Sequence, residues 1–353
     1  MILRSIAFSD FRSYSHQVFS FSPKTTIILG PNAIGKSNLI EAIFLISTGK
    51  SFKAEKDTQM ISFGKNFARV KCLIEEKDAK ETLEVIVSQE ENSTRSYSKK
   101  FLHNGVARRR VDFVGKLPAL LFVPSDLDVI VSSPSQRREF LNTVLELTDR
   151  QYRIAMLSYE KALRQRNALL GVAQETGIRN DEQFAYWDNL LIEHGSYISK
   201  KRRELIEYFN QGDKPILFCS VSYEESAISR ERLDQYRGPE IGAGVTLVGP
   251  HRDDFTVCIK EEDGEDKNVK FFGSRGQQRL VVLQLKLLQL SYIEKITGER
   301  PLLLLDDIFS ELDEKHIKDV LDLITKQQTI LTTTHEEFFD KKIKADVINL
   351  GKI

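Results

Sequence analysis

The sequence has few of the residues that build disulfide or metal scaffolds. Its 353 residues include only three cysteines, Cys72, Cys219 and Cys258, which lie far apart along the chain. No two of them have the spacing of a zinc site or of a redox motif. Disulfides and structural zinc are therefore not expected, and a reducing cytoplasm is the natural setting.

Net charge and long apolar runs are also missing. The 51 lysine and arginine residues balance 51 aspartate and glutamate residues. A nucleic-acid partner would have to meet a local basic patch, because the field of the whole protein does not attract it. No apolar run reaches the roughly 18 residues of a membrane helix, and the charged, polar N-terminus does not resemble a secretory signal. We expect a cytoplasmic protein without a membrane partner.

The composition that remains is that of an ordinary globular protein. Hydrophobic residues make up 41% of the chain and charged residues 29%. At this length the chain can form more than one hydrophobic core.

The N-terminal part reads as short strands around one helix. Apolar, β-branched residues at 18–21 and 25–29 predict a strand, a turn at Ser22-Pro23-Lys24 and a second strand. A helix is predicted over residues 36–46. Alternation of apolar and polar residues at 67–74 and 82–88 predicts an antiparallel sheet.

The middle of the chain has helical periodicity. Ser133 before Pro134 predicts a helix start, with Gln136 completing a capping box. Two long helices follow at 150–170, ending at Gly171, and at 183–209, which at 1.5 Å per residue would reach about 30 to 40 Å. The glycine-rich residues 237–249 return the chain to strand character near residue 245. We therefore predict an N-terminal head part at 1–115, a short helical arm at 116–237 and a C-terminal head part at 238–353.

A phosphate-binding loop is predicted directly after the strand at 25–29 and directly before a helix. Its residues are Gly30, Pro31, Asn32, Ala33, Ile34, Gly35, Lys36 and Ser37. Glycines allow the backbone N–H groups to face phosphate oxygens, and the helix N-terminus adds partial positive charge. Lys36 would neutralise the outer phosphates, and Ser37 would offer its hydroxyl to Mg²⁺. A Gly-Lys-Ser turn at an ordinary helix start is the alternative.

An acidic strand end is the second motif. Residues 302–305 are four leucines, which predict a buried parallel strand, and Asp306 and Asp307 follow where that strand emerges. Asp306 would hold Mg²⁺ through its water shell, and Asp307 could polarise the water that attacks a γ-phosphate.

A third motif indicates a second protomer. Ser274, Gly276 and Gln277 precede an apolar helix at 280–290 and could cradle a phosphate. Because one chain already has a phosphate loop, this second cradle would complete another protomer's site; an ordinary capped helix start is the alternative. Further on come Ser310-Glu311-Leu312-Asp313 and His335, and His335 is either a γ-phosphate sensor or an exposed loop residue.

In this order the motifs resemble those of the ABC-type ATPases. The residues that make up the motifs are similar to those of the RecF family, in the SMC/Rad50-like branch. The blocks that carry the resemblance span essentially the whole chain: Phe11-Arg12-Ser13-Tyr14, Ser47 to Phe52, Arg164 to Leu170, Val248 to Asp254 and Leu305 to Asp313. The implied fold class is α/β, a P-loop ABC-type ATPase head (mixed sheet plus antiparallel β subdomain) with a short helical arm domain.

The resemblance also implies a function. Such proteins bind ATP with Mg²⁺, bind DNA and dimerise when ATP is bound, and slow, DNA-stimulated hydrolysis separates them. They act with RecR and RecO to load the RecA recombinase at single-strand gaps near duplex DNA, in repair, replication restart and the SOS response. Asp307 would take the place of the catalytic acid, and Arg12 would contact phosphate.

Some residues depart from the patterns of relatives. Gly273 and Arg275 stand where transporter ATPases usually have leucine and glycine, which counts against a transporter. Asp307 replaces the usual glutamate, and since aspartate is one methylene shorter we expect slow hydrolysis. Asn142 stands where the family suggests aspartate, and the glutamine loop of the class is not located.

Sequence-independent DNA binding requires lysine and arginine along a phosphate path. Two clusters are favoured: Lys50, Lys53 and Lys56, and Arg108, Arg109 and Arg110. Other clusters are Lys99-Lys100, Arg137-Arg138 and residues 200–203, and any of these clusters could instead be a solvated charged face.

Two other functions stay open: a transporter's nucleotide-binding subunit, and an SMC/Rad50-like nuclease-associated ATPase, which would need a far longer coiled coil.

Overall fold

The chain forms two compact units in the computed structural model, which describes residues 1–77, 79–89, 97–260, 265–308, 326–334 and 345–352. Unit 1 comprises residues 1–126 and 293–353, and unit 2 comprises residues 127–292. The first boundary lies beyond the predicted residue 115, because a strand after that point pairs into the sheet of unit 1. The second boundary lies far beyond the predicted residue 237, because the strands that follow residue 218 pack with the helices of unit 2.

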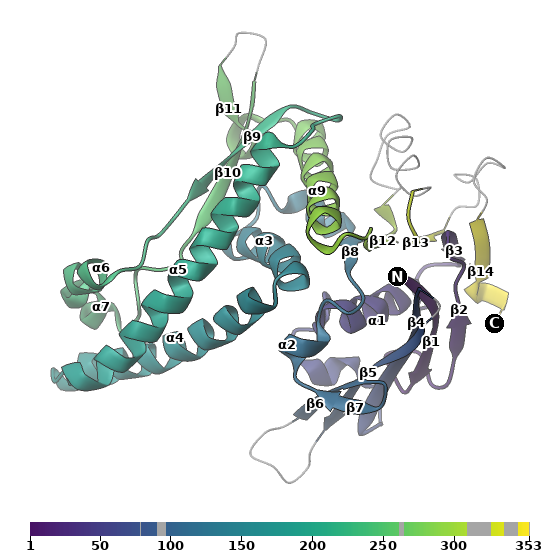
Figure 1. The fold of residues 1–353 in the computed structure, drawn as a ribbon, viewed down its shortest axis with the longest axis horizontal. Helices are drawn as coiled ribbons and strands as arrows, with labels where there is room; N and C mark the ends of the chain where they lie inside the picture. The colour runs from purple at the N-terminus through teal and green to yellow at the C-terminus, as the bar shows by residue number, and fades with distance from the viewer. Residues whose placement is uncertain (78, 90–96, 261–264, 309–325, 335–344, 353) are drawn as a thin grey trace. The chain divides into compact units, whose positions relative to one another are not determined.

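Unit 1 contains a parallel sheet whose strand order is β14-β3-β13-β12-β8 (Figure 1). Its strands are β3 (Thr25–Leu29), β8 (Ala119–Phe122), β12 (Leu302–Asp306), β13 (Thr329–Thr333) and β14 (Ala345–Asn349). Every residue of β3, β8, β12 and β13 is buried, as in a sheet covered on both faces. The prediction of a buried parallel strand from the four leucines is confirmed.

An antiparallel sheet forms the rest of unit 1, in the order β2-β1-β4-β5-β6-β7. Its strands are β1 (Ile2–Ser9), β2 (Val18–Ser20), β4 (Phe67–Glu76), β5 (Ala79–Gln89), β6 (Tyr97–His103) and β7 (Val106–Arg108). The predicted pairing of the two alternating segments is confirmed by β4 and β5. The predicted strand, turn and second strand are confirmed as β2 and β3, but these two strands do not pair with each other: β2 pairs with β1, and β3 enters the parallel sheet.

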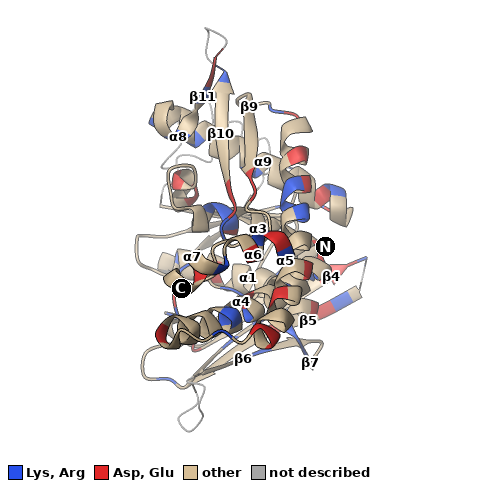
Figure 2. Ribbon diagram, turned by 90° about the vertical axis from the view of Figure 1, so that its left-hand side faces the viewer, with Lys and Arg blue, Asp and Glu red and all other residues tan. Residues whose placement is uncertain are grey.

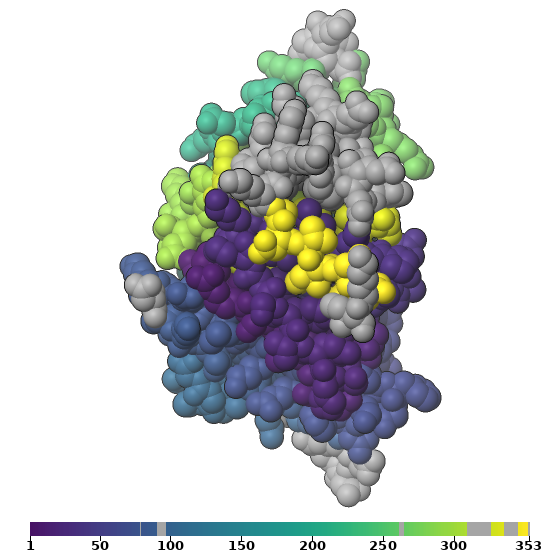
Figure 3. Space-filling view, turned by 90° about the vertical axis from the view of Figure 1, so that its right-hand side faces the viewer, coloured from purple at the N-terminus to yellow at the C-terminus, as the bar shows by residue number. Residues whose placement is uncertain are grey.

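Helix α1 (Lys36–Thr48) packs against strands of both sheets, so one core serves unit 1. A one-turn helix, α2 (Arg110–Phe113), leads into β8. The last strand, β14, pairs with β3, so the C-terminal residues lie against the N-terminal part of the chain (Figure 3).

Unit 2 begins with helices α3 (Pro134–Thr148), α4 (Arg150–Thr176) and α5 (Asp181–Gln211), and α4 packs along α5. The predicted start of α3 at Pro134 is confirmed, but the capping box is not formed, because Ser133 Oγ bonds Ser135 Oγ instead. The prediction that Gly171 ends the first long helix is wrong. The helix continues to Thr176 and ends at Gly177, whose left-handed φ of 71° suits a helix C-terminus.

The remainder of unit 2 is a small antiparallel sheet with short helices. Its strands are β9 (Cys219–Glu224), β10 (Asp254–Lys260) and β11 (Asp266–Asn268), and its helices are α6 (Arg230–Gln235), α7 (Arg237–Ala243) and α8 (Val269–Phe272). The glycine-rich segment predicted to return to strand near residue 245 forms α7 instead, and the next strand starts at residue 254. Helix α9 (Arg275–Thr297) then runs from unit 2 into unit 1.

Basic and acidic residues are mixed along α4 and α5, without one sign covering either helix in this view (Figure 2). None of the described helices has both the length and the apolar character needed to cross a membrane.

Candidate nucleotide site

The predicted phosphate loop lies between β3 and α1, with the geometry such a loop requires. Gly35 has φ of 112° and Ala33 φ of 65°, both in the left-handed region. These values turn the backbone sharply at the start of α1, whose first N–H groups have no acceptor inside the helix. The site can therefore receive an anion at a helix N-terminus.

A turn at Phe11–Tyr14 is hydrogen-bonded to this loop and to the first turn of α1. Tyr14 donates its hydroxyl to the carbonyl oxygen of Gly35 at 3.1 Å, and burial raises the pKa of Tyr14 to about 12, so the phenol stays protonated. Asn38 Nδ2 donates to Ser13 Oγ at 3.0 Å. A Cβ on Gly35 would lie 2.9 Å from Ser13 Oγ. Close approach as well as φ therefore requires glycine at residue 35.

Lys36 is folded onto the loop it belongs to. Its Nζ donates to the carbonyl oxygens of Gly30 at 2.7 Å and Pro31 at 3.0 Å. Burial lowers the pKa of this lysine, while the negative charges of Asp307 and Asp306 oppose that shift. The phosphate loop and the acidic strand end, far apart in sequence, are thus brought together.

Thr332 on β13 positions both acids. Its hydroxyl donates to Asp306 Oδ1 at 2.8 Å and accepts the amide N–H of Asp307 at 3.0 Å. Asp306 is buried, and Asp307 has φ of 52°, a strained value for a residue with a side chain. Backbone strain of this kind costs about 1–3 kcal/mol and is concentrated at functional sites.

Arg12 forms an ion pair with a buried carboxylate. Its Nε and Nη2 donate to the two oxygens of Glu41, at 2.9 and 2.6 Å, and Glu41 is fully buried on α1. Ser51 also donates its hydroxyl to Glu41 Oε1 and accepts the amide of Lys53 at 2.9 Å. Glu41 therefore links the Arg12 turn, the phosphate-loop helix and the loop after that helix.

Lys53 belongs to the surroundings of the nucleotide site. Desolvation lowers the pKa of its ammonium, and the charges of Asp306 and Glu41 partly offset the shift. A cation near Asp306 adds to the positive potential at which a polyphosphate would lie. Lys53, proposed from sequence as a DNA contact, therefore lies within electrostatic range of the acids of the nucleotide site.

Comparison with known proteins agrees with this geometry. Residues 2–350 match the family described as RecF/RecN/SMC N terminal domain. The chain is 34% identical to the DNA replication and repair protein RecF of Lachnoclostridium phytofermentans, over 99% of this chain and 97% of that one. The chain belongs to the RecF family.

Other members of the RecF family match over similar lengths. The protein of the same description from Gloeobacter violaceus is 35% identical over 97% of this chain and 94% of its own. A solved structure described as the recombination mediator protein RecF with ATP in the RecFOR pathway superposes with a TM-score of 0.87, at 29% identity, covering 99% of this chain and 96% of that one. The whole-chain match confirms the predicted family and fold class, and favours DNA repair over the transporter interpretation.

In this RecF-family chain the Ser274 segment caps α9. Ser274 Oγ accepts the amide of Gln277 at 3.2 Å, and Gln277 Oε1 accepts the amide of Ser274 at 2.8 Å. This reciprocal pair is a capping box, the simpler of the two interpretations offered by the sequence. Ser274 is exposed and Gln277 is partly exposed, so the same groups remain accessible to a partner, and the role across a dimer stays a prediction.

The two favoured basic clusters of this family member meet at the C-terminal end of α1. Arg110 donates from Nε and Nη2 to Thr48 O, at 3.1 and 2.7 Å, and Lys99 Nζ donates to Gly49 O at 3.1 Å. Such cations complement the negative end of a helix. Arg109 pairs with Asp112 at 3.1 Å, and Arg108, Lys50 and Lys56 complete the group.

Three residues of the site were not predicted from the sequence: Tyr14, Glu41 and Thr332. Tyr14 lies in a block quoted for the family resemblance, and Glu41 is an acid on the apolar face of the predicted helix, which signals a buried partner. Thr332 begins a run of three threonines, and nothing in that run marks it as a partner of Asp306. His335 and the Ser310–Asp313 segment lie outside the described residues.

Proposed function

We propose that this RecF-family protein is an ATP-switched DNA-binding protein of recombinational repair and replication restart. ATP binding brings two heads together on DNA, and slow hydrolysis releases them. The observation that carries the proposal is the meeting of Lys36 with Asp306 and Asp307 beside a phosphate loop, in a chain that matches the RecF family over its whole length.

The donor set suits ATP with Mg²⁺. The loop amides and Lys36 would bind the phosphates, and Ser37 with Asp306 would supply the oxygen ligands that a hard cation prefers, through water at Asp306. When bound, Mg²⁺ would neutralise charge on the phosphate oxygens. Thr332 holds Asp306 in a fixed rotamer for this role.

Asp307 is the residue proposed to orient the attacking water. Its backbone has a left-handed φ directly after the strand, and its amide donates to the hydroxyl of Thr332. Arg12 is the proposed phosphate contact, and in this structure it is held by Glu41. Contact with ATP would require its guanidinium to be shared with, or released from, that carboxylate. His335 remains proposed as a γ-phosphate sensor.

An ATP-dependent homodimer is supported by the surface around Ser274. The proposed trans contacts are Ser274, Gly276 and Gln277. Phe271 and Phe272, directly before them on α8, are 71% and 70% exposed. Two adjacent exposed phenylalanines are unusual on a monomer surface and suit an interface that forms on demand.

DNA contact is proposed for the basic group at the end of α1. Lys50, Lys56 and Arg108 would face phosphates, with Lys53 placed toward the nucleotide side, while Arg110 and Lys99 hold the group in position and Arg109 is partly neutralised by Asp112. Both single-stranded and double-stranded DNA are proposed ligands, at gaps or junctions. RecR and RecO are proposed as protein partners in recombinase loading and SOS induction, on the family membership alone.

The test is DNA retention with and without ATP for the wild type, Asp307→Asn and Lys36→Ala. The wild type should hold DNA more tightly with ATP, Asp307→Asn should remain on DNA after ATP is added, and Lys36→Ala should ignore ATP. DNA binding by the wild type and by Asp307→Asn that does not respond to ATP would refute the switch.

The basic group is tested separately by charge reversal at Arg108 together with Lys50→Glu. Affinity for all DNA sequences should fall alike, because phosphate contacts carry no sequence information. The matched control is Arg203→Gln, which removes an exposed arginine of unit 2 that is already paired with Glu225. Unchanged affinity of the reversed variant at low salt would remove the group from the proposal.

A further inference from the structure

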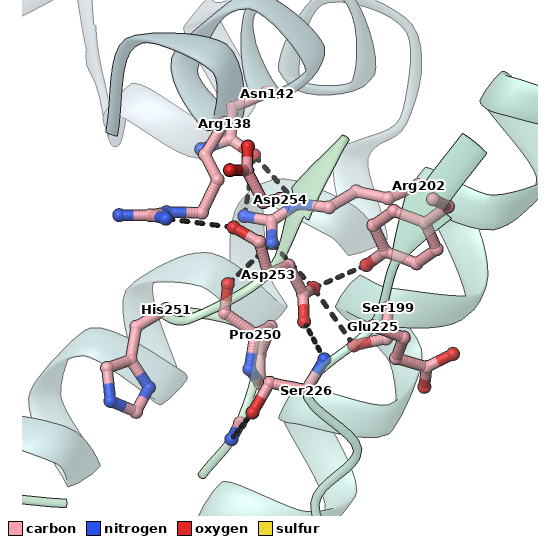
Figure 4. Close-up of polar contacts among 12 residues, drawn as sticks. Arg138, Asn142, Ser199, Arg202, Glu225, Ser226, Pro250, His251, Asp253 and Asp254 are labelled. Carbon is pink, nitrogen blue, oxygen red and sulfur yellow. Dashed lines mark hydrogen bonds and ion pairs between the residues drawn. The ribbon is translucent and has the colours of Figure 1, made fainter. Parts of the chain in front are cut away.

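Unit 2 contains a network of arginines and acids around a turn that leads into β10 (Figure 4). At its centre Asp253 is fully buried. Its carboxylate accepts from Arg202 Nη1 at 2.9 Å, from the amide of Ser226 at 2.8 Å and from the hydroxyls of Tyr223 and Ser199. The carboxylate of Asp253 is therefore neutralised by Arg202, and it also accepts hydrogen bonds from three neutral donors.

The neighbouring acid is engaged in the same way. Asp254 accepts from Arg137 Nε at 2.6 Å and Nη2 at 2.7 Å, a two-pronged pair in which Arg137 is buried. Arg137 also donates to the carbonyl oxygens of Ile130 and Ser132. Both carboxylates of the turn are thus committed to buried arginines.

Two further arginines at this turn bond only to neutral acceptors in the described structure. Arg138 Nη1 donates to the carbonyl oxygen of Asp253 at 2.9 Å, and Arg252 Nη2 donates to that of Thr246 at 3.3 Å. A carbonyl oxygen orients a guanidinium without cancelling its charge. Four guanidinium groups therefore meet two carboxylates, and Arg138 and Arg252 carry the excess.

The pKa of His251 shows that the charges of Arg138 and Arg252 both act on its imidazole ring. Burial, reinforced by the positive charges of Arg252 and Arg138, lowers the pKa of His251 to about 4. The neutral ring accepts the hydroxyl of Tyr159 at Nδ1 and donates from Nε2 to Thr246 O at 3.1 Å. Figure 4 shows the side chains of Arg138 and His251 extending to the same side of the network, away from Arg202. The positive charges of Arg138 and Arg252 therefore both act on the side of the network where His251 lies.

We propose that Arg138 and Arg252 form a phosphodiester-binding site for a DNA strand on unit 2, separate from the basic group at the end of α1. The proposal rests on the DNA binding proposed above and adds a second place of contact. Guanidinium groups match phosphate oxygens with paired N–H donors, and both groups are held at one turn before any ligand arrives. Arg252 is exposed and Arg138 partly exposed, so both can be reached.

DNA fits this arrangement better than an acidic protein segment. Duplex DNA presents about one negative charge per 1.7 Å of its axis, so a strand crossing the turn satisfies both arginines in any register. A protein carboxylate would have to be placed individually opposite each guanidinium. The site recognises charge and spacing but no base, as sequence-independent binding requires.

The test is the salt dependence of DNA affinity for the wild type and for Arg138→Gln with Arg252→Gln. Each lost phosphate contact reduces the slope of log affinity against log salt by about 0.9, so the double variant should lose about 1.8 of slope on duplex DNA. At 0.1 M salt that corresponds to a loss of affinity of up to about 60-fold. The measurement is fluorescence anisotropy with a labelled duplex and a labelled single strand.

Two control variants separate charge from structure. Arg203→Gln removes an exposed arginine of the same unit that Glu225 already neutralises, and it should leave the slope unchanged. Arg138→Lys with Arg252→Lys keeps the charges and should keep the wild-type slope, even if the absolute affinity falls. Thermal unfolding of each variant shows whether the turn has kept its structure.

The outcomes are distinct. If the wild type binds no DNA at any salt concentration, the proposed DNA function fails and this site fails with it. If the wild type binds DNA and the double glutamine variant keeps its slope, this site is refuted while the proposed function stands. A loss of slope shared equally by the lysine and glutamine variants would assign the arginines to structure and refute the site. Loss of a protein partner with DNA binding intact would assign them to that partner and also refute the site.

Discussion

Gly35→Ala is the substitution that most sharply tests the phosphate loop. Gly35 has φ of 112°, so any side chain there is strained, at a cost of about 1–3 kcal/mol. The new Cβ would also lie 2.9 Å from Ser13 Oγ and 3.1 Å from Tyr14 Oη. These contacts are too close, and the loop or the Phe11–Tyr14 turn has to move.

Either movement disturbs the hydrogen bonds of Tyr14 to Gly35 and of Asn38 to Ser13, which hold the first turn of α1. We therefore expect ATP affinity to fall at least tenfold, which corresponds to about 1.4 kcal/mol of lost binding free energy. We also expect the free energy of unfolding to drop by more than backbone strain alone would give.

Gly105→Ala is the matched control. Gly105 has a positive φ of 77°, but nothing lies within 4 Å of its would-be Cβ. Gly105→Ala therefore introduces backbone strain without a close contact, and it should leave ATP affinity unchanged. Binding of a fluorescent ATP analogue and chemical denaturation measure the two quantities. Wild-type ATP affinity in Gly35→Ala, with a stability loss no greater than that of Gly105→Ala, would refute the role given to this loop.

Three further predictions follow from single residues. Asp307→Glu should hydrolyse ATP faster in a steady-state assay, because the longer side chain reaches further toward the attacking water, and an unchanged or lower rate would contradict this. Arg166→Met should destabilise unit 2 by about 3–5 kcal/mol, since it leaves the buried acids Asp188 and Glu240 without Arg166, whereas Arg203→Met at an exposed pair should cost no more than about 1 kcal/mol. His251 has a pKa of about 4 against an ordinary value of 6.5, so the unfolded chain binds the extra proton first and stability should fall as pH drops from 6.5 to 4. His251→Gln should remove that part of the pH dependence, and parallel stability curves for the two proteins would contradict the assignment.

The local motifs were predictable because each depends on neighbours in sequence. Each of these motifs can be recognised from a few consecutive residues. They are the phosphate loop, the run of four leucines in β12, and the alternation of apolar and polar residues in β4 and β5. Gly171 was misinterpreted as a helix stop because glycine inside a helix costs only about 1 kcal/mol, and packing of α4 on α5 outweighs that cost.

The supporting contacts were not predictable, because they join residues far apart in the chain. Nothing near Glu41 in the sequence indicates that Arg12 and Ser51 will meet it. The arginines of the Arg137-Arg138 cluster look alike in sequence, yet Arg137 is buried on Asp254 and Arg138 stays without a carboxylate in the described network. The bounds of unit 2 differ from those of the predicted arm for the same reason, since strand pairing between separate segments contributes to the unit.

The most direct test of the nucleotide switch is the molecular mass of the protein in solution, measured by light scattering with and without ATP and Mg²⁺. The proposal predicts a monomer without ATP, a dimer with ATP, and a longer-lived dimer for Asp307→Asn. Ser274→Arg, which blocks the exposed cap of α9, should stay monomeric while still binding ATP. A mass that is the same with and without ATP, for both the wild type and Asp307→Asn, would contradict the central claim.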